Sequence, residues 1–265
     1  MNQEFLAVEP WSGLCNRLRA IFSFYKLSNK LNKPFLVVWD CHRENTCMGN
    51  ILDYYDKIPN VDYIILKNKD ETSNHTYKGI QLYARHNKQN KPYNICSSGG
   101  EYADGRNPEY CGKYSNLYKE LKLNSYMQDI INNNKLKIKK YISVHIRRTD
   151  HKHHEPDENY INFLKKYPEY NIYIACDNSN IQNKFYELFN DRILTQKHKA
   201  GRDTGSRFTD LKDAIIDLHM CIESDIFYGT HHSSFSELIY SKRYFNNKMN
   251  DYELKIAKKK GAVKI

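Results

Sequence analysis

Hydrophobic and polar positions in the first 40 residues follow two different periods. Short apolar runs occupy 5–8 and 35–39, with the turn-forming segment Pro10-Trp11-Ser12-Gly13 after the first. Between the runs, apolar residues recur with helical spacing at Leu14, Leu18, Ile21, Phe22, Tyr25 and Leu31. The pattern predicts a strand, a turn, a helix and a second strand. The helix begins at the carboxyl end of the first strand, where open α/β sheets bind ligands.

The same alternation of strand and helix patterns continues in the second half. Apolar runs predict strands at 63–66, 171–175 and 226–228, and alternating apolar residues predict a strand at 141–146. Helical spacing covers 117–131, 160–167 and 181–189. It is most regular over 208–222, where apolar residues fall at Leu211, Ala214, Ile215, Leu218 and Ile222.

Strands that alternate with helices in both halves favour the α/β class. Residues 67–111 are polar and show no sustained period, whereas the asparagines at 132–134, followed by lysines, are typical of a linker. We therefore expect two Rossmann-like domains, residues 1–132 and 133–265, that face each other across a cleft.

Charge raises the question of an anionic partner. The chain has 41 Lys and Arg against 31 Asp and Glu, a net charge of +10, together with 22 Tyr that could stack on bases. A basic nucleic-acid-binding protein is therefore an alternative to a protein that binds a phosphorylated small molecule. Much of the excess is scattered lysine, including a cluster at the C-terminal end that resembles a solvated surface: Lys255, Lys258, Lys259, Lys260 and Lys264.

Membrane insertion, secretion and metal binding are not indicated. The longest apolar stretch, 35–39, is far shorter than the roughly 20 residues of a membrane span, and the first residues lack the pattern of a signal peptide. We expect a cytoplasmic protein with reduced thiols. The seven cysteines are scattered, and the histidines at 151, 153 and 154 have no common zinc spacing, so we expect no metal.

Two arginines directly follow the predicted strand 141–146, within His145-Ile146-Arg147-Arg148-Thr149-Asp150. A planar guanidinium matches phosphate oxygens with paired hydrogen bonds, so this strand end suits a diphosphate. If the chain is still extended, His145 and Arg147 share one face and Arg148 points away. We therefore expect Arg147 to bind the ligand, and Arg148 could form a structural ion pair, with Asp150 as one candidate.

Two further segments join a strand to a helix start. Gly229-Thr230-His231-His232-Ser233-Ser234 offers backbone N–H groups, hydroxyls and the positive end of a helix dipole, which together suit an anion. An ordinary serine N-cap, with capping-box spacing from Ser234 to Glu237, explains the same residues equally well. The segment 13–17, with Gly13, Asn16 and Arg17, has the same geometry in the first half.

Asp217 lies between Ile216 and Leu218 on the predicted helix 208–222. A carboxylate in such a place is costly to bury unless it accepts hydrogen bonds. Guanine offers two parallel donors that a carboxylate can accept together, so Asp217 is a candidate reader of guanine. A solvated helix face, the alternative, fits Asp213 better than Asp217.

Together these segments resemble the GDP-fucose-dependent fucosyltransferases, and most closely the α1,6-fucosyltransferases. The matching motifs are 145–150, the turn at 13–17, Ala175-Cys176-Asp177-Asn178 and the run at 210–238. The resemblance implies a GT-B-like fold and metal-independent, inverting transfer of fucose from GDP-β-L-fucose to a sugar hydroxyl of a glycan. GDP-fucose is then a substrate, and no cofactor is expected.

The resemblance also implies roles for individual residues. Arg147 would offset charge on the departing GDP, with Arg148 in support, while Glu155 would be the general base. Several residues would bind the donor: Gly13, Asn16, Arg17, His145, Asp217, Ser233 and Ser234. Asp177 and His151 would position the acceptor or the sugar. A transferase that uses another GDP-sugar stays an alternative, because guanine and diphosphate contacts do not identify the hexose.

Overall fold

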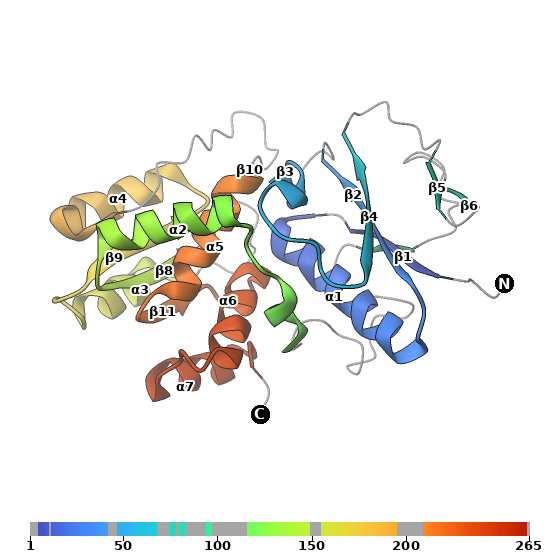
Figure 1. Cartoon of the computed structure of the whole chain (residues 1–265). Coiled ribbons are helices and arrows are strands. Elements are labelled where there is room, and N and C mark those ends of the chain that lie inside the picture. The colour runs from blue at the N-terminus through green and yellow to red at the C-terminus, as the bar shows by residue number, and fades with distance from the viewer. Residues whose placement is uncertain are drawn as a thin grey trace. The chain divides into compact units, whose positions relative to one another are not determined.

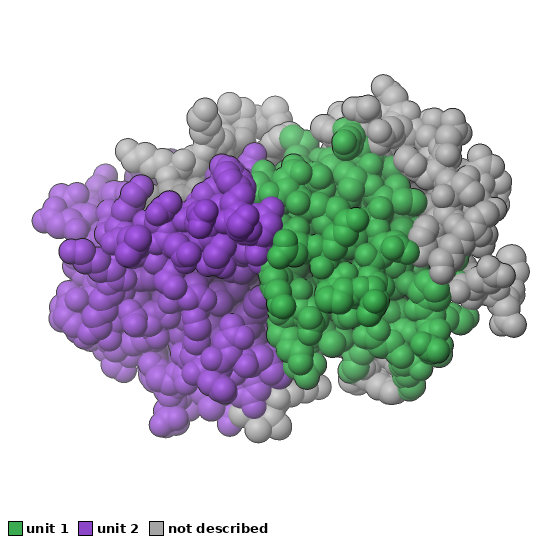
Figure 2. All heavy atoms as spheres, viewed as in Figure 1, with its two compact units in different colours: residues 1–122 green, residues 123–265 purple. Residues whose placement is uncertain are grey.

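The computed structural model describes residues 5–10, 12–41, 47–67, 75–77, 80–82, 94–96, 116–148, 155–194 and 209–263. The chain forms two compact units, Met1–Lys122 and Leu123–Ile265, which Figure 2 colours separately. Each unit contains its own parallel sheet (Figure 1). The predicted boundary at 132/133 lies ten residues beyond the observed division at 122/123 (132 − 122).

Unit 1 is built on a four-stranded sheet with the order β4-β2-β1-β7, in which all neighbouring strands are parallel. The strands are β1 (Leu6–Pro10), β2 (Phe35–Asp40), β4 (Val61–Leu66) and β7 (Asn94–Cys96). Every residue of β2 is buried, as expected for a central parallel strand covered on both faces. Helix α1 (Leu14–Leu31) packs against β1 and β2.

The remaining elements of unit 1 are short. They are β3 (Cys47–Met48), η1 (Ile51–Asp53), the antiparallel pair β5 (His75–Tyr77) and β6 (Ile80–Leu82), and η4 (Asn116–Glu120). Tyrosine contributes to this core, since Tyr55 and Tyr118 are each only 2% exposed. The ring of Tyr118 packs edge-on against Phe22 of α1, with the ring centroids 4.8 Å apart.

Unit 2 is built on a three-stranded parallel sheet with the order β11-β8-β9. The strands are β8 (Tyr141–Ile146), β9 (Asn171–Cys176) and β11 (Ile226–Gly229), and a two-residue strand β10 (Thr209–Asp210) lies outside this sheet. The helices are α2 (Ser125–Ile138), α3 (Asp157–Lys165), α4 (Ser179–Phe189), η5 (Asn190–Arg192), α5 (Leu211–Glu223), α6 (Ser234–Phe245) and α7 (Asp251–Lys259).

Alternate residues of β8 contribute to the two faces of the unit 2 sheet. Ile142, Val144 and Ile146 join a core with α3 and α4, whereas α5 packs against β8 and β9. Tyr141 donates a hydrogen bond from its hydroxyl to the carbonyl of Met220 on α5, at 2.8 Å. The carboxyl end of β8 therefore emerges between two layers of helices.

Helix α2 corrects the predicted linker at 132–134. Its N-cap is Asn124, whose side chain accepts a hydrogen bond from the Met127 N–H at 3.0 Å. Met127 and Ile131 are buried at a helical spacing of four residues, so packing of this face outweighs the modest helix penalty of three asparagines. Within the described ranges, no helix is long and apolar enough to cross a membrane.

Candidate active site

The candidate site in unit 2 starts at the carboxyl end of β8. The imidazole Nδ1 of His145 lies 2.8 Å from the hydroxyl of Ser236 on α6, and its ring packs against Phe235 at 4.7 Å between centroids. Arg148 instead reaches Asp157 at the start of α3. The two side chains thus leave the strand on opposite sides, as the alternation along the sequence predicts.

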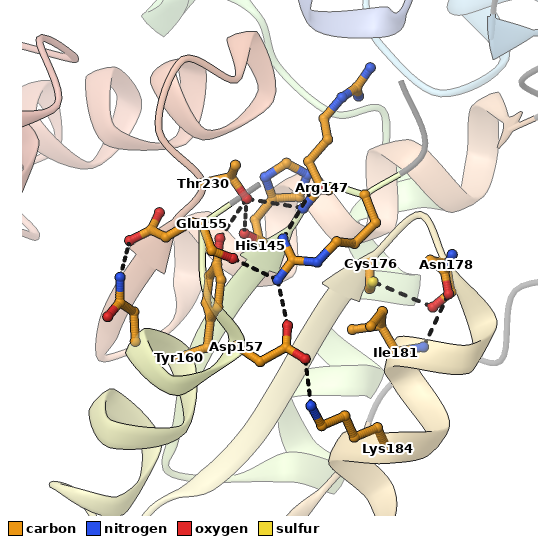
Figure 3. Close-up of polar contacts among 12 residues, drawn as sticks. His145, Arg147, Glu155, Asp157, Tyr160, Cys176, Asn178, Ile181, Lys184 and Thr230 are labelled. Atoms are coloured by element: carbon orange, nitrogen blue, oxygen red, sulfur yellow. Dashed lines mark hydrogen bonds and ion pairs between the residues drawn. The ribbon is translucent and has the colours of Figure 1, made fainter. Parts of the chain in front are cut away.

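Thr230 joins this strand end to the segment that precedes α6. Its hydroxyl donates to the carbonyl of His145 at 2.8 Å and accepts a hydrogen bond from the backbone N–H of Arg147 at 3.0 Å. The same oxygen lies 2.8 Å from the hydroxyl of Tyr160 on α3. Thr230, 1% exposed, therefore fixes the backbone of Arg147 (Figure 3).

The side chain of Arg147 is half-buried and extends away from Asp157 (Figure 3). Its backbone is held by Thr230, while its guanidinium lies at the end of a rigid strand. This combination of fixed backbone and directed side chain is suited to a ligand-binding arginine.

Arg148 is held on all sides. Its backbone N–H donates to Asp177 Oδ1 at 2.8 Å, and its guanidinium donates to the Glu155 carbonyl at 2.8 Å and to Asp157 Oδ1 at 2.5 Å. Lys184 of α4 binds the second oxygen of Asp157 at 2.7 Å. Arg148 thus forms a structural ion pair, as predicted, and its partner in the structure is Asp157. Asp150, which the sequence suggested as the partner, lies outside the described residues. Asp177, the predicted positioning residue, contacts the backbone of Arg148.

The carboxylate of Glu155 is also engaged. It accepts hydrogen bonds from Lys260 Nζ, at 2.8 and 3.1 Å, and from the hydroxyl of Tyr228. Burial raises the pKa of the Glu155 carboxyl, but the bonds from Lys260 and Tyr228 outweigh burial and leave the pKa below its ordinary value. Glu155 is therefore ionised and weakly basic, which suits a structural carboxylate better than a strong base.

The N-terminus of α6 differs from an ordinary serine cap. Ser233 occupies the N-cap position, one residue before the predicted capping box, yet its side chain makes no capping hydrogen bond. The residue is 3% exposed, and its Oγ has no hydrogen-bond partner among the described residues. Ser234 is the first helical residue. Two adjacent hydroxyls and the free N–H groups of the first turn thus lie at the positive end of the helix dipole.

Asp217 lies on α5 and is 7% exposed. The hydroxyl of Tyr173, on β9, donates to its Oδ1 at 2.7 Å. The prediction that Asp217 is buried rather than solvated is confirmed, and one of its oxygens is held by protein. Its role toward guanine stays a prediction.

The first-half motif lies in unit 1. Gly13 is the N-cap of α1, and Asn16 donates from Nδ2 to Ser12 Oγ at 3.1 Å. Arg17, however, is completely buried. Its guanidinium donates to the carbonyls of Pro10 and Asp40 and stacks on Trp39, 3.9 Å from the ring centroid. The structure thus gives Arg17 contacts that hold α1 to the strand ends, and its predicted diphosphate contact has no support here.

His151 lies outside the described residues. Within the part of the chain that the structure describes, no group of three or more His, Cys, Asp or Glu side chains could hold a metal ion. The sequence analysis did not predict the roles of Thr230, Tyr160, Asp157 and Lys260. It placed Thr230 in a segment suited to an anion, whereas the structure shows its hydroxyl bound to the backbone of His145 and Arg147. Nothing in the sequence distinguishes Lys260 from its neighbours.

Comparison with known proteins addresses the identity of this site. Residues 118–246, which include β8, α5 and the N-terminus of α6, match the family model described as GDP-fucose protein O-fucosyltransferase. This segment is similar to that family, and the match covers slightly less than half of the chain. The predicted resemblance to GDP-fucose-dependent fucosyltransferases is therefore confirmed. A search of curated proteins by sequence gave no match.

Solved fucosyltransferases share the fold at low identity. NodZ α-1,6-fucosyltransferase soaked with GDP-fucose aligns with a TM-score of 0.57 and 11% identity, over 90% of this chain and 92% of that chain. NodZ from Bradyrhizobium gives 0.54 and 12%, over 90% and 93%. POFUT1 in complex with GDP-fucose gives 0.54 and 9%, over 92% and 95%. The α/β class with two parallel sheets is confirmed, and it matches these fucosyltransferases; the cleft between the domains stays a prediction.

Proposed function

We propose that this protein transfers fucose from GDP-β-L-fucose to a hydroxyl of an acceptor, with inversion and without a metal. The proposal is supported by the family of residues 118–246 and by the chemistry of the strand end described above. The predicted acceptor is a sugar hydroxyl of a glycan, and a protein hydroxyl is the alternative that the name of the family suggests.

The single observation that carries the proposal is the N-terminus of α6. A capping serine normally satisfies one of the unpaired N–H groups of the first turn, but the Ser233 side chain makes no such bond. Its buried Oγ lacks a partner among the described residues, although a buried hydroxyl normally has one. A diphosphate oxygen at this helix start would accept from the hydroxyl and from the backbone N–H groups together.

Arg147 would supply the positive charge for the reaction. Bond breakage at the fucose carbon leaves one additional negative charge on the β-phosphate of GDP, and a guanidinium placed beside it stabilises the charge that develops during departure. Thr230 accepts from the Arg147 backbone N–H at 3.0 Å, which holds the start of this side chain in place. His145 and Asp217 are the proposed contacts to guanine, and Ser233 and Ser234 to the diphosphate.

A donor screen tests the proposal. The full chain is incubated with GDP-fucose, GDP-mannose and UDP-sugars, and release of free nucleotide is measured with glycan and peptide acceptors. We expect turnover with GDP-fucose and a GDP-induced rise in melting temperature. Turnover of another GDP-sugar but not of GDP-fucose would identify that sugar as the donor. A protein that neither binds nor turns over any GDP compound, and that binds single-stranded nucleic acid in a salt-dependent way, would overturn the proposal.

Arg147→Ala should lower kcat on the order of 10²-fold or more, because it removes charge stabilisation that the transition state needs. Arg147→Lys should recover only part of the loss, since an ammonium lacks the planar pair of donors. Lys165→Ala removes an exposed cation at the end of α3 and is the matched control. Near-normal turnover of Arg147→Ala would remove this residue from the site.

A further inference from the structure

Lys260 follows α7, fourteen residues beyond the end of the family match at 246 (260 − 246). The sequence places it within a run of surface lysines, yet its side chain is only 11% exposed. Its ammonium donates to both oxygens of Glu155, at 2.8 and 3.1 Å, and to the carbonyl of Gly229, at 2.6 Å. An ammonium has three N–H donors, so these bonds satisfy the group completely.

These contacts join two segments that carry predicted donor-binding residues. Gly229 immediately precedes Thr230, which binds the backbone N–H of Arg147. Glu155 belongs to the segment after β8, and its backbone carbonyl accepts from the guanidinium of Arg148 at 2.8 Å. One buried ammonium thus touches both sides of the strand end from which Arg147 projects.

Other groups reinforce the same contact. The hydroxyl of Tyr228 donates to Glu155, and the Lys260 ammonium lies over the Tyr228 ring, 4.1 Å from its centroid. The backbone of His231 helps to lower the pKa of the Glu155 carboxyl. Glu155 therefore receives hydrogen bonds from Tyr228 of β11 and from Lys260, which follows α7. A carboxylate satisfied in this way holds position rather than moving with a ligand.

We infer that Lys260 is a positioning residue of the transferase, which holds Glu155 and Gly229 so that Arg148, Thr230 and through them Arg147 keep the geometry needed for departure of GDP. The inference rests on the proposed function, and it extends the functional unit beyond the segment that matches the family. Lys260 itself contacts Glu155, Gly229 and Tyr228 rather than Arg147, Ser233 or Ser234, the residues proposed to bind the diphosphate. Its effect reaches the reaction through the two segments it joins.

The test compares Lys260→Met with Lys258→Met in the full chain. Methionine keeps most of the side-chain length but loses the charge and all three hydrogen bonds, whereas Lys258 is an exposed cation on α7, two residues before Lys260. Release of GDP from GDP-fucose gives kcat and KM, and GDP titration gives Kd. We expect Lys260→Met to lower kcat by about 10- to 100-fold, the size of effect that a small misplacement of a catalytic group produces. We expect donor KM and the Kd for GDP to change less than threefold.

Lys260→Arg separates positioning from a general loss of stability. The guanidinium keeps the charge and can still bind Glu155, so we expect it to restore most of kcat. Tyr228→Phe, which removes one bond to Glu155 and leaves the ring in place, should lower kcat in the same direction by a smaller factor. It also serves as the deciding variant if Lys260→Met does not fold.

The outcomes separate the two proposals. A wild-type protein that neither binds GDP nor releases it from GDP-fucose overturns the proposed function, and the inference with it. An active wild type with kcat of Lys260→Met within twofold of Lys258→Met overturns the inference alone. So does a loss confined to KM, or, where Lys260→Met does not fold, a Tyr228→Phe variant with unchanged kcat.

Discussion

Thr230→Val should destabilise unit 2 by about 2–4 kcal/mol, although the two side chains have nearly the same shape. The hydroxyl has one proton, which it donates to the carbonyl of His145, so Tyr160 is the donor in the contact between their hydroxyls. Valine leaves the Tyr160 hydroxyl and the Arg147 N–H without this acceptor. The ring of Tyr160 is fully buried, and an unsatisfied buried donor costs about 1–3 kcal/mol.

The other terms of this substitution are smaller. Arg147 is half-buried, so its N–H falls at the low end of that range. The His145 carbonyl still accepts from the Thr230 N–H at 3.1 Å, which limits the cost of the lost hydroxyl bond. Because valine is more apolar than threonine, its burial recovers less than about 1 kcal/mol of the lost stability.

The measurement is urea unfolding followed by far-UV circular dichroism. Both tryptophans, Trp11 and Trp39, belong to unit 1, so tryptophan fluorescence follows the other unit as an internal control. Thr230→Ser keeps the hydroxyl and is the matched control for the loss of a methyl group.

A double-mutant cycle tests the mechanism directly. Thr230→Val leaves the Tyr160 hydroxyl without an acceptor, and Tyr160→Phe removes that hydroxyl. The double variant should therefore be at least about 1 kcal/mol more stable than the sum of the two single effects predicts. Additive effects, within about 0.5 kcal/mol, would refute the reasoning. A Thr230→Val protein as stable as Thr230→Ser would refute it as well.

Two further predictions concern other parts of unit 2. A Cβ on Gly229 would lie 2.5 Å from Ser236 Oγ and 2.7 Å from Phe227 Cζ, so Gly229→Ala should lower the free energy of unfolding by about 1–3 kcal/mol. It should also weaken GDP binding, because it displaces Ser236, the hydrogen-bond partner of His145. An unchanged melting temperature and an unchanged GDP titration would contradict this prediction. Burial raises the pKa of Glu223, but Lys135 and Lys248 outweigh it and lower the pKa to about 2. Since the folded-state pKa lies below the unfolded value of about 4.3, these ion pairs stabilise the fold above that pH and are lost as pH falls toward 2. Glu223→Gln should flatten the decline of stability across this window in acid titrations, with Glu158→Gln, an exposed carboxylate on α3, as control.

Local pattern was sufficient to predict the strand that carries the site. Residues 141–146 form β8 as expected, because apolar side chains alternate along this segment with the period of a strand, and all six residues are buried. The same alternation predicted that His145 and Arg148 would leave on opposite sides. Both predictions depend only on neighbours within a few residues.

Predictions that depended on distant partners were less successful. An arginine in the first turn of a helix could bind a ligand or pack inside, and for Arg17 the outcome depended on Trp39 and Asp40, more than twenty residues away along the chain. Lys260 looked like its exposed neighbours, and its partner Glu155 is 105 residues away. The sequence could not separate a capping serine from an anion site at Ser233, because the difference lies in where one hydroxyl points.

The hydroxyl of Thr230 also fixes the donor-to-acceptor direction of the hydrogen bonds at the strand end. Burial raises the pKa of Tyr160, so its hydroxyl stays protonated and remains a donor. The row from Tyr160 through Thr230 to the His145 carbonyl then has a single polarity, because a backbone carbonyl cannot return a proton. Such a row does not relay protons in either direction. In the proposed transfer, a proton that leaves the acceptor hydroxyl would therefore depart by a route other than the row of Tyr160, Thr230 and the His145 carbonyl.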